Sequence, residues 1–342
     1  KKYLKKKGIK MSNLNKNLQQ AKRVKNDEFY TQLKDIENEL KHYKSHFKNK
    51  VVYCNADDPR VSNFFHYFSY NFDYLGLKKL ITTCYKNQEM DLFSMHDQES
   101  AIALIYEGEK DNGRVPTVEN IGVIKLKGDG DFRSPEAIEF LKEADIVVTN
   151  PPFSLFREYM QQIVEYDKNF IVLGNQNAIT YREIFPLIKE NKMWLGHNNG
   201  VKEFIIPEDA PKKAGQRIDE NGIRYQKFGN IVWYTNLDIQ KRHEELIVFK
   251  KYNENDYPTY DNYNAIEVSK VIDIPFDYSG AMGVPITFLD KHNPNQFEII
   301  GATESEGKGF SYGLWDSTSS VSQSMVNGKR TYKRLFIKKV VK

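Results

Sequence analysis

Short apolar runs and segments of helical periodicity alternate between residues 50 and 195 of the chain. Short apolar runs predict buried strands, and apolar residues spaced three or four positions apart predict helices with one buried face. This alternation is typical of a mostly parallel sheet with helices on both faces, so the sequence predicts an α/β fold. The predicted strands are 51–54, 80–85, 102–108, 121–128, 145–149 and 170–174, and the predicted helices are 31–47, 134–144, 154–166 and 180–191. Leu33, Ile36, Leu40 and Tyr43 form the apolar face of helix 31–47, and Ser134 suits the N-terminal cap of helix 134–144.

A further helix is expected after the first strand, because an aromatic cluster follows a polar segment there. Asp58 suits the N-terminal cap of this helix, and Pro59 suits its first turn, where proline loses no hydrogen bond. The helix would hold Phe64, Phe65, Tyr67 and Phe68.

The pattern changes near residue 196, where short β-like runs separated by Gly, Pro, Asn and Asp replace the helices. These runs are 203–207, 230–237, 244–249 and 298–304. We therefore predict three parts: a basic segment 1–25, an α/β domain 26–196 and a smaller β-rich region 197–342.

Charge is distributed unevenly, although the net charge of the 342 residues is only +4. Residues 1–26 hold ten Lys/Arg and no acid, and residues 310–342 hold seven Lys/Arg against Asp316 alone, so the body between them is acidic. Basic ends favour contact with a polyanion, although solvated termini would show the same charges. In the C-terminal run, basic and apolar residues alternate as in a strand with one charged face. Candidate contacts to nucleic-acid phosphates are Lys329, Arg330, Lys333 and Arg334, and Trp233 is either a core residue or an aromatic contact.

Cysteine and histidine spacing predicts no metal centre. The two cysteines, Cys54 and Cys84, form no CxxC pair, and the seven histidines show no ligand spacing. Two isolated cysteines fit a reduced cytoplasm, and no apolar run approaches the length of about 20 residues that crosses a bilayer.

Thr149-Asn150-Pro151-Pro152-Phe153 is the segment with the clearest chemical signature. It follows a buried strand and precedes a helix, which is the end of a strand where α/β sheets bind ligands. The Asn150 side chain and the Pro151 carbonyl offer two acceptors to an exocyclic amine such as N6 of adenine, and Phe153 offers a face for stacking. A rigid Pro-Pro turn without a catalytic role is the alternative.

Asn-Pro-Pro-Phe in this position resembles motif IV of the amino-methyltransferases. Five segments together resemble the EcoRI-type adenine-specific DNA methyltransferases over residues 25 to 340: 27–32 (DEFYTQ), 54–65 (CNADDPRVSNFF), 149–156 (TNPPFSLF), 233–238 (WYTNLD) and 286–301 (ITFLDKHNPNQFEIIG). The resemblance implies a Rossmann-like class I methyltransferase domain with S-adenosyl-L-methionine as donor, followed by a DNA target-recognition region in the gamma-type order.

The resemblance also implies site residues and partners. By this comparison the catalytic residues are Asn150, Pro151, Pro152 and Phe153, and the cofactor contacts are Phe29, Tyr30, Thr31, Asn55, Asp57, Asp58, Asp131 and Phe132. The expected partner is double-stranded DNA, and a cognate restriction endonuclease would act on the same site without a stable complex. A monomer suffices if the enzyme reads the site one strand at a time.

The cofactor motif departs from the general methyltransferase pattern. Asn55-Ala56 stands where a Gly-rich turn is usual, and no acid follows the second strand at Thr82 and Thr83. Two other functions stay open. NPPF-type motifs also serve methyltransferases that act on RNA or on a protein glutamine, and the altered cofactor motif would also fit a DNA-binding protein that has lost catalysis.

Overall fold

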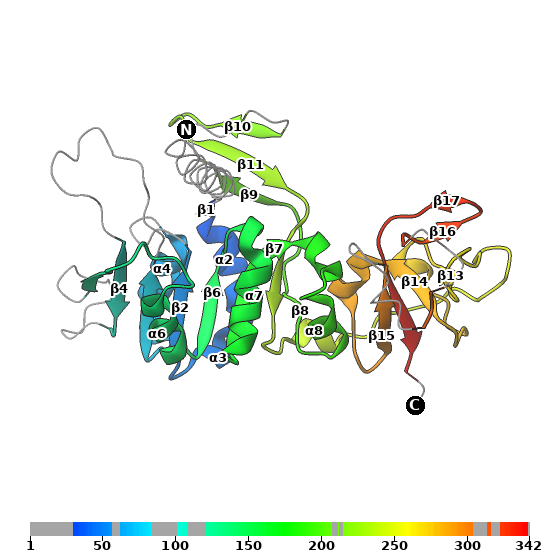
Figure 1. The fold of residues 1–342 in the computed structure, drawn as a ribbon, viewed down its shortest axis with the longest axis horizontal. Helices are drawn as coiled ribbons and strands as arrows, with labels where there is room; N and C mark the ends of the chain where they lie inside the picture. Colours follow the sequence, from blue (N-terminus) through cyan, green and yellow to red (C-terminus); the bar gives the residue numbers. More distant parts are fainter. Residues whose placement is uncertain are drawn as a thin grey trace, which may run out of the picture. The chain divides into compact units, whose positions relative to one another are not determined.

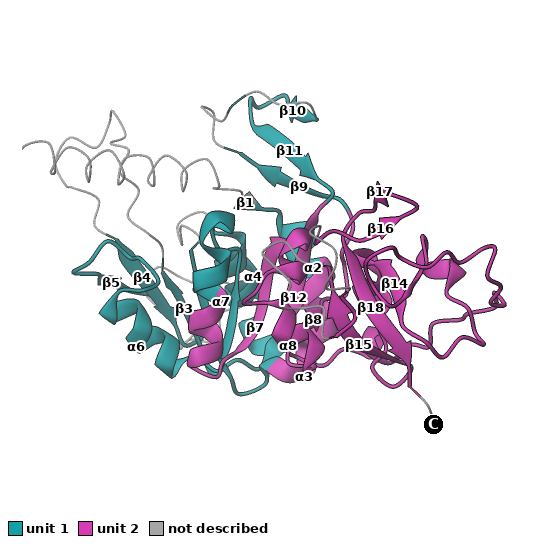
Figure 2. Cartoon of the chain, turned by 45° about the vertical axis from the view of Figure 1, so that its right-hand side comes forward, with its two compact units in different colours: residues 1–37, 47–159, 201–229 teal, residues 38–46, 160–200, 230–342 magenta. Residues whose placement is uncertain are grey.

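The computed structural model describes residues 30–56, 62–83, 101–108, 121–206, 211, 215–303, 313–315 and 322–340. The chain divides into two compact units, coloured separately in Figure 2. The first comprises residues 1–37, 47–159 and 201–229, and the second comprises 38–46, 160–200 and 230–342. Because the chain passes between the units more than once, these units do not follow the predicted boundary at residue 196. The assignment of DNA recognition to residues 197–342 stays a prediction.

Five strands of the first unit form a sheet in the order β5-β4-β3-β2-β6. Strands β4, β2 and β6 of this sheet are labelled in Figure 1. They are β2 (Val51–Asn55), β3 (Lys79–Thr83), β4 (Ile102–Tyr106), β5 (Ile121–Lys125) and β6 (Ile146–Thr149). β2 runs parallel to β3 and β6, and every residue of β2 and β6 is buried. The carboxyl ends of β3, β2 and β6 therefore meet at one edge of the sheet, which is where α/β sheets bind ligands. This arrangement confirms the predicted α/β fold.

The outer strands of this sheet differ from the predicted parallel arrangement. β4 pairs antiparallel with both β3 and β5. Parallel neighbours need a crossover connection, usually a helix, whereas strands joined by loops can reverse direction and pair directly. The polar sequence between β4 and β5 contains no helical pattern, which is the signal that favours an antiparallel pair.

Serine side chains cap α6 and α4 of the first unit. α6 (Pro135–Glu143) starts after Ser134, whose hydroxyl accepts a hydrogen bond from the Ala137 N–H at 3.2 Å, as the sequence predicts. α4 (Asn63–Tyr70) starts after Ser62, whose hydroxyl accepts from the Phe65 N–H. The prediction of Asp58 as the cap of this helix is therefore wrong, since Ser62 stands where the extended chain turns into the helix. α5 (Phe72–Leu75) follows at once.

The predicted helix 31–47 is divided into α2 (Leu33–Leu40), a 3₁₀ turn η1 (Lys41–Tyr43) and α3 (Lys44–Phe47). Of the four residues of the predicted apolar face, Ile36, Leu40 and Tyr43 are fully buried and Leu33 is half-buried. The predicted helix 154–166 becomes η3 (Phe153–Leu155) followed by α7 (Phe156–Glu165).

A second sheet of the first unit has the order β1-β9-β11-β10, and all its pairs are antiparallel. Its strands are β1 (Tyr30–Thr31), β9 (Lys202–Ile205), β10 (Gln216–Ile218) and β11 (Arg224–Phe228). The segment predicted to lie near the cofactor, at Tyr30 and Thr31, is thus an edge strand of this sheet.

Three strands of the second unit pair antiparallel in the order β7-β12-β8. They are β7 (Asn169–Asn175), β12 (Ile231–Thr235) and β8 (Trp194–Leu195), with η4 (Gln176–Thr180) and α8 (Phe185–Lys189) between β7 and β8. The predicted helix 180–191 is therefore shorter than expected.

The C-terminal part of the second unit is β-rich, as predicted. A sheet of order β13-β14-β18-β15 contains β13 (Ile266–Glu267), β14 (Met282–Pro285), β15 (Phe297–Ala302) and β18 (Arg334–Lys339). β16 (Met325–Val326) and β17 (Lys329–Arg330) form a separate hairpin. The 3₁₀ turns η5 (Gln240–His243), η6 (Val271–Asp273) and η7 (Ile286–Lys291) connect these elements.

Residues 244–249 form no strand, although their apolar run predicts one. The backbone of Leu246 instead exchanges hydrogen bonds with the side chain of Gln296, at 2.9 and 2.6 Å. Ile247 and Phe249 are exposed. Within the described ranges, no helix is both long and apolar enough to cross a membrane.

Candidate active site

The segment Asn150-Pro151-Pro152-Phe153 leaves the sheet directly at the carboxyl end of β6. Asn150 is only 7% exposed. Pro152 has extended backbone angles, φ −55° and ψ 124°, and its carbonyl accepts from the Leu155 N–H at 3.0 Å, which starts the turn η3. The two prolines thus fix the exit from the strand, and the segment occupies the position predicted from the sequence.

Asn55 lies at the carboxyl end of the neighbouring strand β2. Its carbonyl accepts a hydrogen bond from the Thr149 hydroxyl, and its side-chain oxygen accepts one from the hydroxyl of Tyr159 in α7. Burial raises the pKa of Tyr159 well above its ordinary value, so the hydroxyl keeps its proton and remains a donor. The end of β2 is therefore tied both to the residue before Asn150 and to the helix that follows it.

Ala56, the next residue, has a φ of 79°. This left-handed region strains any residue with a Cβ, and glycine is the usual occupant. The Ala56 N–H donates to the Thr83 carbonyl at 3.1 Å, which fixes the turn. The backbone therefore makes the turn that the missing glycines would make, with the smallest side chain that has a Cβ.

Phe132 and Asp131 lie in the loop before α6. Phe132 is 7% exposed and packs edge-on against Tyr159, with ring centroids 5.2 Å apart. Asp131 accepts from the Arg133 guanidinium at 2.7 Å, and Arg133 also contacts Glu158 at 2.8 Å. Although burial raises the pKa of Asp131, the hydrogen bonds from Arg133 hold it below the usual value. Asp131 is thus engaged by Arg133, and Phe132 is the residue that packs on Tyr159.

Thr31 joins this region through a backbone contact. Its carbonyl accepts from the Asn63 side chain at 2.7 Å, and Asn63 is the first residue of α4. The Thr31 hydroxyl is buried and has no hydrogen-bond partner among the described residues, and the same is true of the Thr82 hydroxyl in β3. Buried hydroxyls without a partner are costly unless a ligand or water satisfies them.

Three predicted cofactor contacts, Phe29, Asp57 and Asp58, lie outside the described residues, as does the basic segment 1–25. Tyr159 and Thr82 were not among the site residues predicted from the sequence. Tyr159 is one of several aromatics in an amphipathic helix, and nothing in the sequence marks it apart from a core residue. Two consecutive threonines at the end of a buried strand were the available signal for Thr82.

The five predicted DNA contacts separate into exposed and buried residues. Lys329 and Arg330 are exposed on the β16–β17 hairpin. Lys333 donates to the Thr180 hydroxyl at 3.0 Å. Arg334 is 7% exposed and forms an ion pair of 2.6 Å with buried Glu267, and Trp233 is fully buried in β12. These last two side chains are enclosed by protein and do not present a surface to a duplex.

Comparison with known proteins decides the family. Residues 17–340 match the family described as "Adenine-specific methyltransferase EcoRI". The chain belongs to this family. It is 52% identical to the Type II methyltransferase M.EcoRI of Escherichia coli, over 95% of this chain and 96% of that protein.

Two Mycoplasma proteins are also similar over nearly their whole length. The Type II methyltransferase M.MgeORF184P of Mycoplasma genitalium is 39% identical over 93% of this chain and 97% of its own. M.MpnI of Mycoplasma pneumoniae is 38% identical over 93% and 96%. No solved structure matches the chain. The resemblance stated from five sequence segments is confirmed, and the protein is an adenine-specific methyltransferase of the EcoRI family.

Proposed function

We propose that the protein transfers a methyl group from S-adenosyl-L-methionine to N6 of an adenine within a short specific sequence of double-stranded DNA. The observation that carries this proposal is the Asn150-Pro151-Pro152-Phe153 segment at the carboxyl end of buried β6, in a chain of the adenine-specific EcoRI family. Because N6 is not accessible inside a duplex, the target adenine is extruded from the stack before methylation.

Asn150 and Pro151 would act on the adenine amine. The lone pair of N6 is delocalised into the ring, so the amine is a poor nucleophile. Hydrogen bonds from the two N6 hydrogens to the Asn150 side-chain oxygen and the Pro151 carbonyl favour the tetrahedral nitrogen that develops during attack. Phe153 offers the extruded base a stacking surface worth about 1–3 kcal/mol. Pro152 keeps the acceptors in place by fixing the backbone.

The residues around Asn55 suit a nucleoside-containing cofactor. The buried hydroxyls of Thr31 and Thr82 offer hydrogen bonds that no described residue takes up, and the Ala56 turn presents backbone with little side-chain bulk. S-Adenosyl-L-methionine supplies an activated methyl group bound to a sulfonium. We assign its binding to Thr31, Asn55, Thr82 and Phe132. The contacts Phe29, Tyr30, Asp57, Asp58 and Asp131 are added from the sequence.

DNA contact is proposed for the exposed Lys329 and Arg330 and for the half-buried Lys333. We also propose that the enzyme is cytoplasmic and acts as a monomer, alongside a restriction endonuclease that cuts the same sequence without forming a stable complex with it. A methylated adenine in each site would then block cleavage of the cell's own DNA.

The acceptor class is tested by supplying DNA, RNA and protein separately with a methyl-labelled donor. Label in DNA alone, on N6 of adenine, is the expected result. Label only in RNA or on protein glutamine would establish the first alternative. Saturable cofactor heat in calorimetry distinguishes an enzyme from a DNA-binding protein without catalysis, which would show none.

A further inference from the structure

The β16–β17 hairpin is a tight, polar projection of the second unit. Met325 pairs with Arg330 and Val326 with Lys329. The turn residues are Asn327, with φ 51°, and Gly328, with φ 74°. Two successive left-handed residues with the sequence Asn-Gly are typical of a type I′ turn, whose twist matches that of paired strands. Residues 327–330 are all exposed.

Asp261 holds the turn of this hairpin from outside. Its carboxylate accepts hydrogen bonds from the N–H groups of Asn327, at 3.1 Å, and Gly328, at 2.7 Å. Its own N–H donates to the Met325 carbonyl at 2.8 Å. The Asn262 side chain accepts from the Met325 N–H at 3.0 Å and donates to the Gln323 carbonyl at 2.8 Å. An isolated two-stranded hairpin is marginally stable, so these bonds fix its position.

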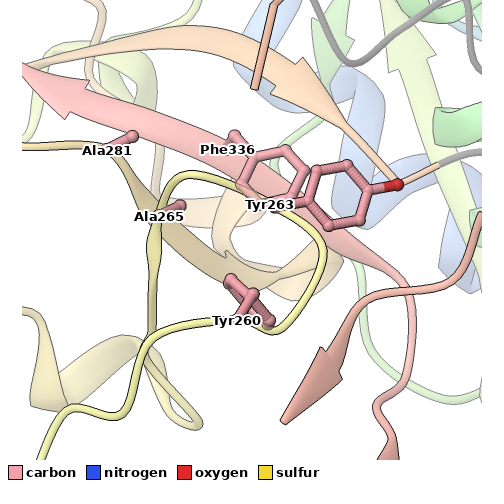
Figure 3. Packing of buried hydrophobic residues seen from close by; sticks show 5 residues of the cluster. All are labelled: Tyr260, Tyr263, Ala265, Ala281 and Phe336. Atoms are coloured by element: carbon pink, nitrogen blue, oxygen red, sulfur yellow. The ribbon is translucent and has the colours of Figure 1, made fainter. Parts of the chain in front are cut away.

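The loop that contains Asp261 and Asn262 is itself anchored in the core. Tyr260 and Tyr263 flank these residues, and both pack against Phe336 of β18, with ring centroids 5.9 and 4.7 Å apart. Ala265 and Ala281 complete the cluster (Figure 3). The hairpin therefore stands on a rigid base, as expected of a binding element whose contacts must be held in a fixed geometry.

The side chains of the hairpin suit a nucleic-acid groove. Consecutive residues of a strand point to opposite faces, so Lys329 and Arg330 lie on the two sides of the ribbon. Neither forms an ion pair with any residue that the structure describes. The Asn327 carboxamide stands exposed at the tip. The major groove admits a two-stranded ribbon, and Asn pairs with the acceptor and donor of adenine there.

We propose that the hairpin Met325–Arg330 enters the major groove of the target duplex tip first. Asn327 faces the base edges, Lys329 and Arg330 contact the phosphates of the two walls, and Asp261 and Asn262 position the hairpin. The inference rests on the proposed function, because it assumes a specific DNA sequence as substrate. It assigns one specificity-determining residue, Asn327, and two positioning residues that do not touch the DNA.

The main test variant is Asn327→Gly, since glycine accepts the left-handed φ and only the carboxamide is lost. The matched control is Asn221→Gly, in the exposed Asn-Gly turn between β10 and β11, where Asp219 likewise accepts from the Asn221 N–H at 3.0 Å. The methylated motif is first identified by sequencing DNA from cells that express the wild type. kcat/KM is then measured on duplexes with that motif and with each single base pair replaced.

Asn327→Gly should lower discrimination at one or two base pairs by about tenfold and leave the salt dependence of DNA binding unchanged. Asp261→Ala should lower the same discrimination while cofactor binding by calorimetry stays at the wild-type value. Asn221→Gly should behave as wild type. Unchanged discrimination in Asn327→Gly overturns the inference, whether or not Asp261→Ala folds. A wild type that methylates no DNA would instead refute the proposed function.

Discussion

The hydroxyl of Tyr159 donates a hydrogen bond to the side-chain oxygen of Asn55, and the same ring packs on Phe132 at 5.2 Å. One side chain of α7 thus organises two residues that the sequence predicts near the cofactor. α7 also follows the catalytic segment directly, so the cofactor region and the segment at Asn150 share one support.

Tyr159→Phe keeps the ring but removes the donor, and leaves a buried carboxamide oxygen without its partner. Loss of one partner of a buried hydrogen bond costs about 1–3 kcal/mol. We expect cofactor affinity, measured by calorimetry, to fall about tenfold, with a smaller effect on kcat at saturating cofactor. The control is Tyr70→Phe, at a tyrosine 55% exposed on α4. Equal cofactor affinity in both variants would show that Tyr159 only fills space.

Mutation of the buried ion pair Arg334–Glu267 should change the stability of the fold rather than DNA binding. Glu267 pairs with the Arg334 guanidinium and also accepts a hydrogen bond from the Tyr260 hydroxyl. Loss of the Glu267 charge would therefore leave the buried guanidinium without a counter-charge. Removing one partner of a buried ion pair costs about 3–5 kcal/mol. Glu267→Gln should therefore lower the free energy of unfolding in urea markedly.

The matched variant for this pair is Arg334→Met combined with Glu267→Gln. Removing both charges leaves neither one buried alone, so the double variant should lose less stability than Glu267→Gln. A larger loss in the double variant would contradict the structural role assigned to the pair.

Lys329 and Arg330 should account for part of the salt dependence of DNA binding. Each phosphate contact contributes about 0.9 to the slope of log K against log salt. Replacing both by Ala is expected to reduce the slope by about 2, measured by fluorescence anisotropy. Lys338→Ala, at an exposed lysine of β18, serves as a control for general charge. A slope unchanged by the double replacement would remove the hairpin from the DNA contact.

Buried His292 should make the folded state less stable in mild acid. Burial lowers its pKa to about 4, and its Nε2 lies 2.8 Å from the Phe297 carbonyl. Because the unfolded chain binds the proton near pH 6.5 and the folded chain does not, stability is unaffected above that pH and falls as pH drops from about 6.5 to 4.

Between pH 8 and 5 this histidine should account for about 2 kcal/mol of lost stability. His292→Gln keeps a donor for the Phe297 carbonyl and removes the titration. Its free energy of unfolding should therefore change less than that of the wild type over this interval. An identical pH dependence in the two proteins would show that His292 is not the group responsible.

The features that could be predicted from the sequence belong to contiguous segments of the chain. Asn150 to Phe153 follow one strand without interruption, so their place at its carboxyl end follows from the strand alone. The capping role of Ser134 is equally local. Tyr159 could not be identified, because its contact with Asn55 joins residues 104 positions apart.

The C-terminal basic residues show what the sequence could not predict. Alternating charge predicts an exposed face for the whole run, yet Arg334 turns inward because buried Glu267, from a distant strand, offers a partner. The antiparallel β4 and the turn at Ala56 likewise depend on how the chain pairs in space rather than on local composition.

Methylation of DNA in cells that express the wild type or Asn150→Ala tests the central claim most directly. The control is Asn177→Ala, at an exposed asparagine of η4. Single-molecule sequencing should find N6-methyladenine confined to one short motif in the wild type and in the control. The rate measured with purified Asn150→Ala should fall by about 10²–10³, with DNA binding retained. Full methylation by Asn150→Ala, or modified adenine in none of the three, would contradict the account.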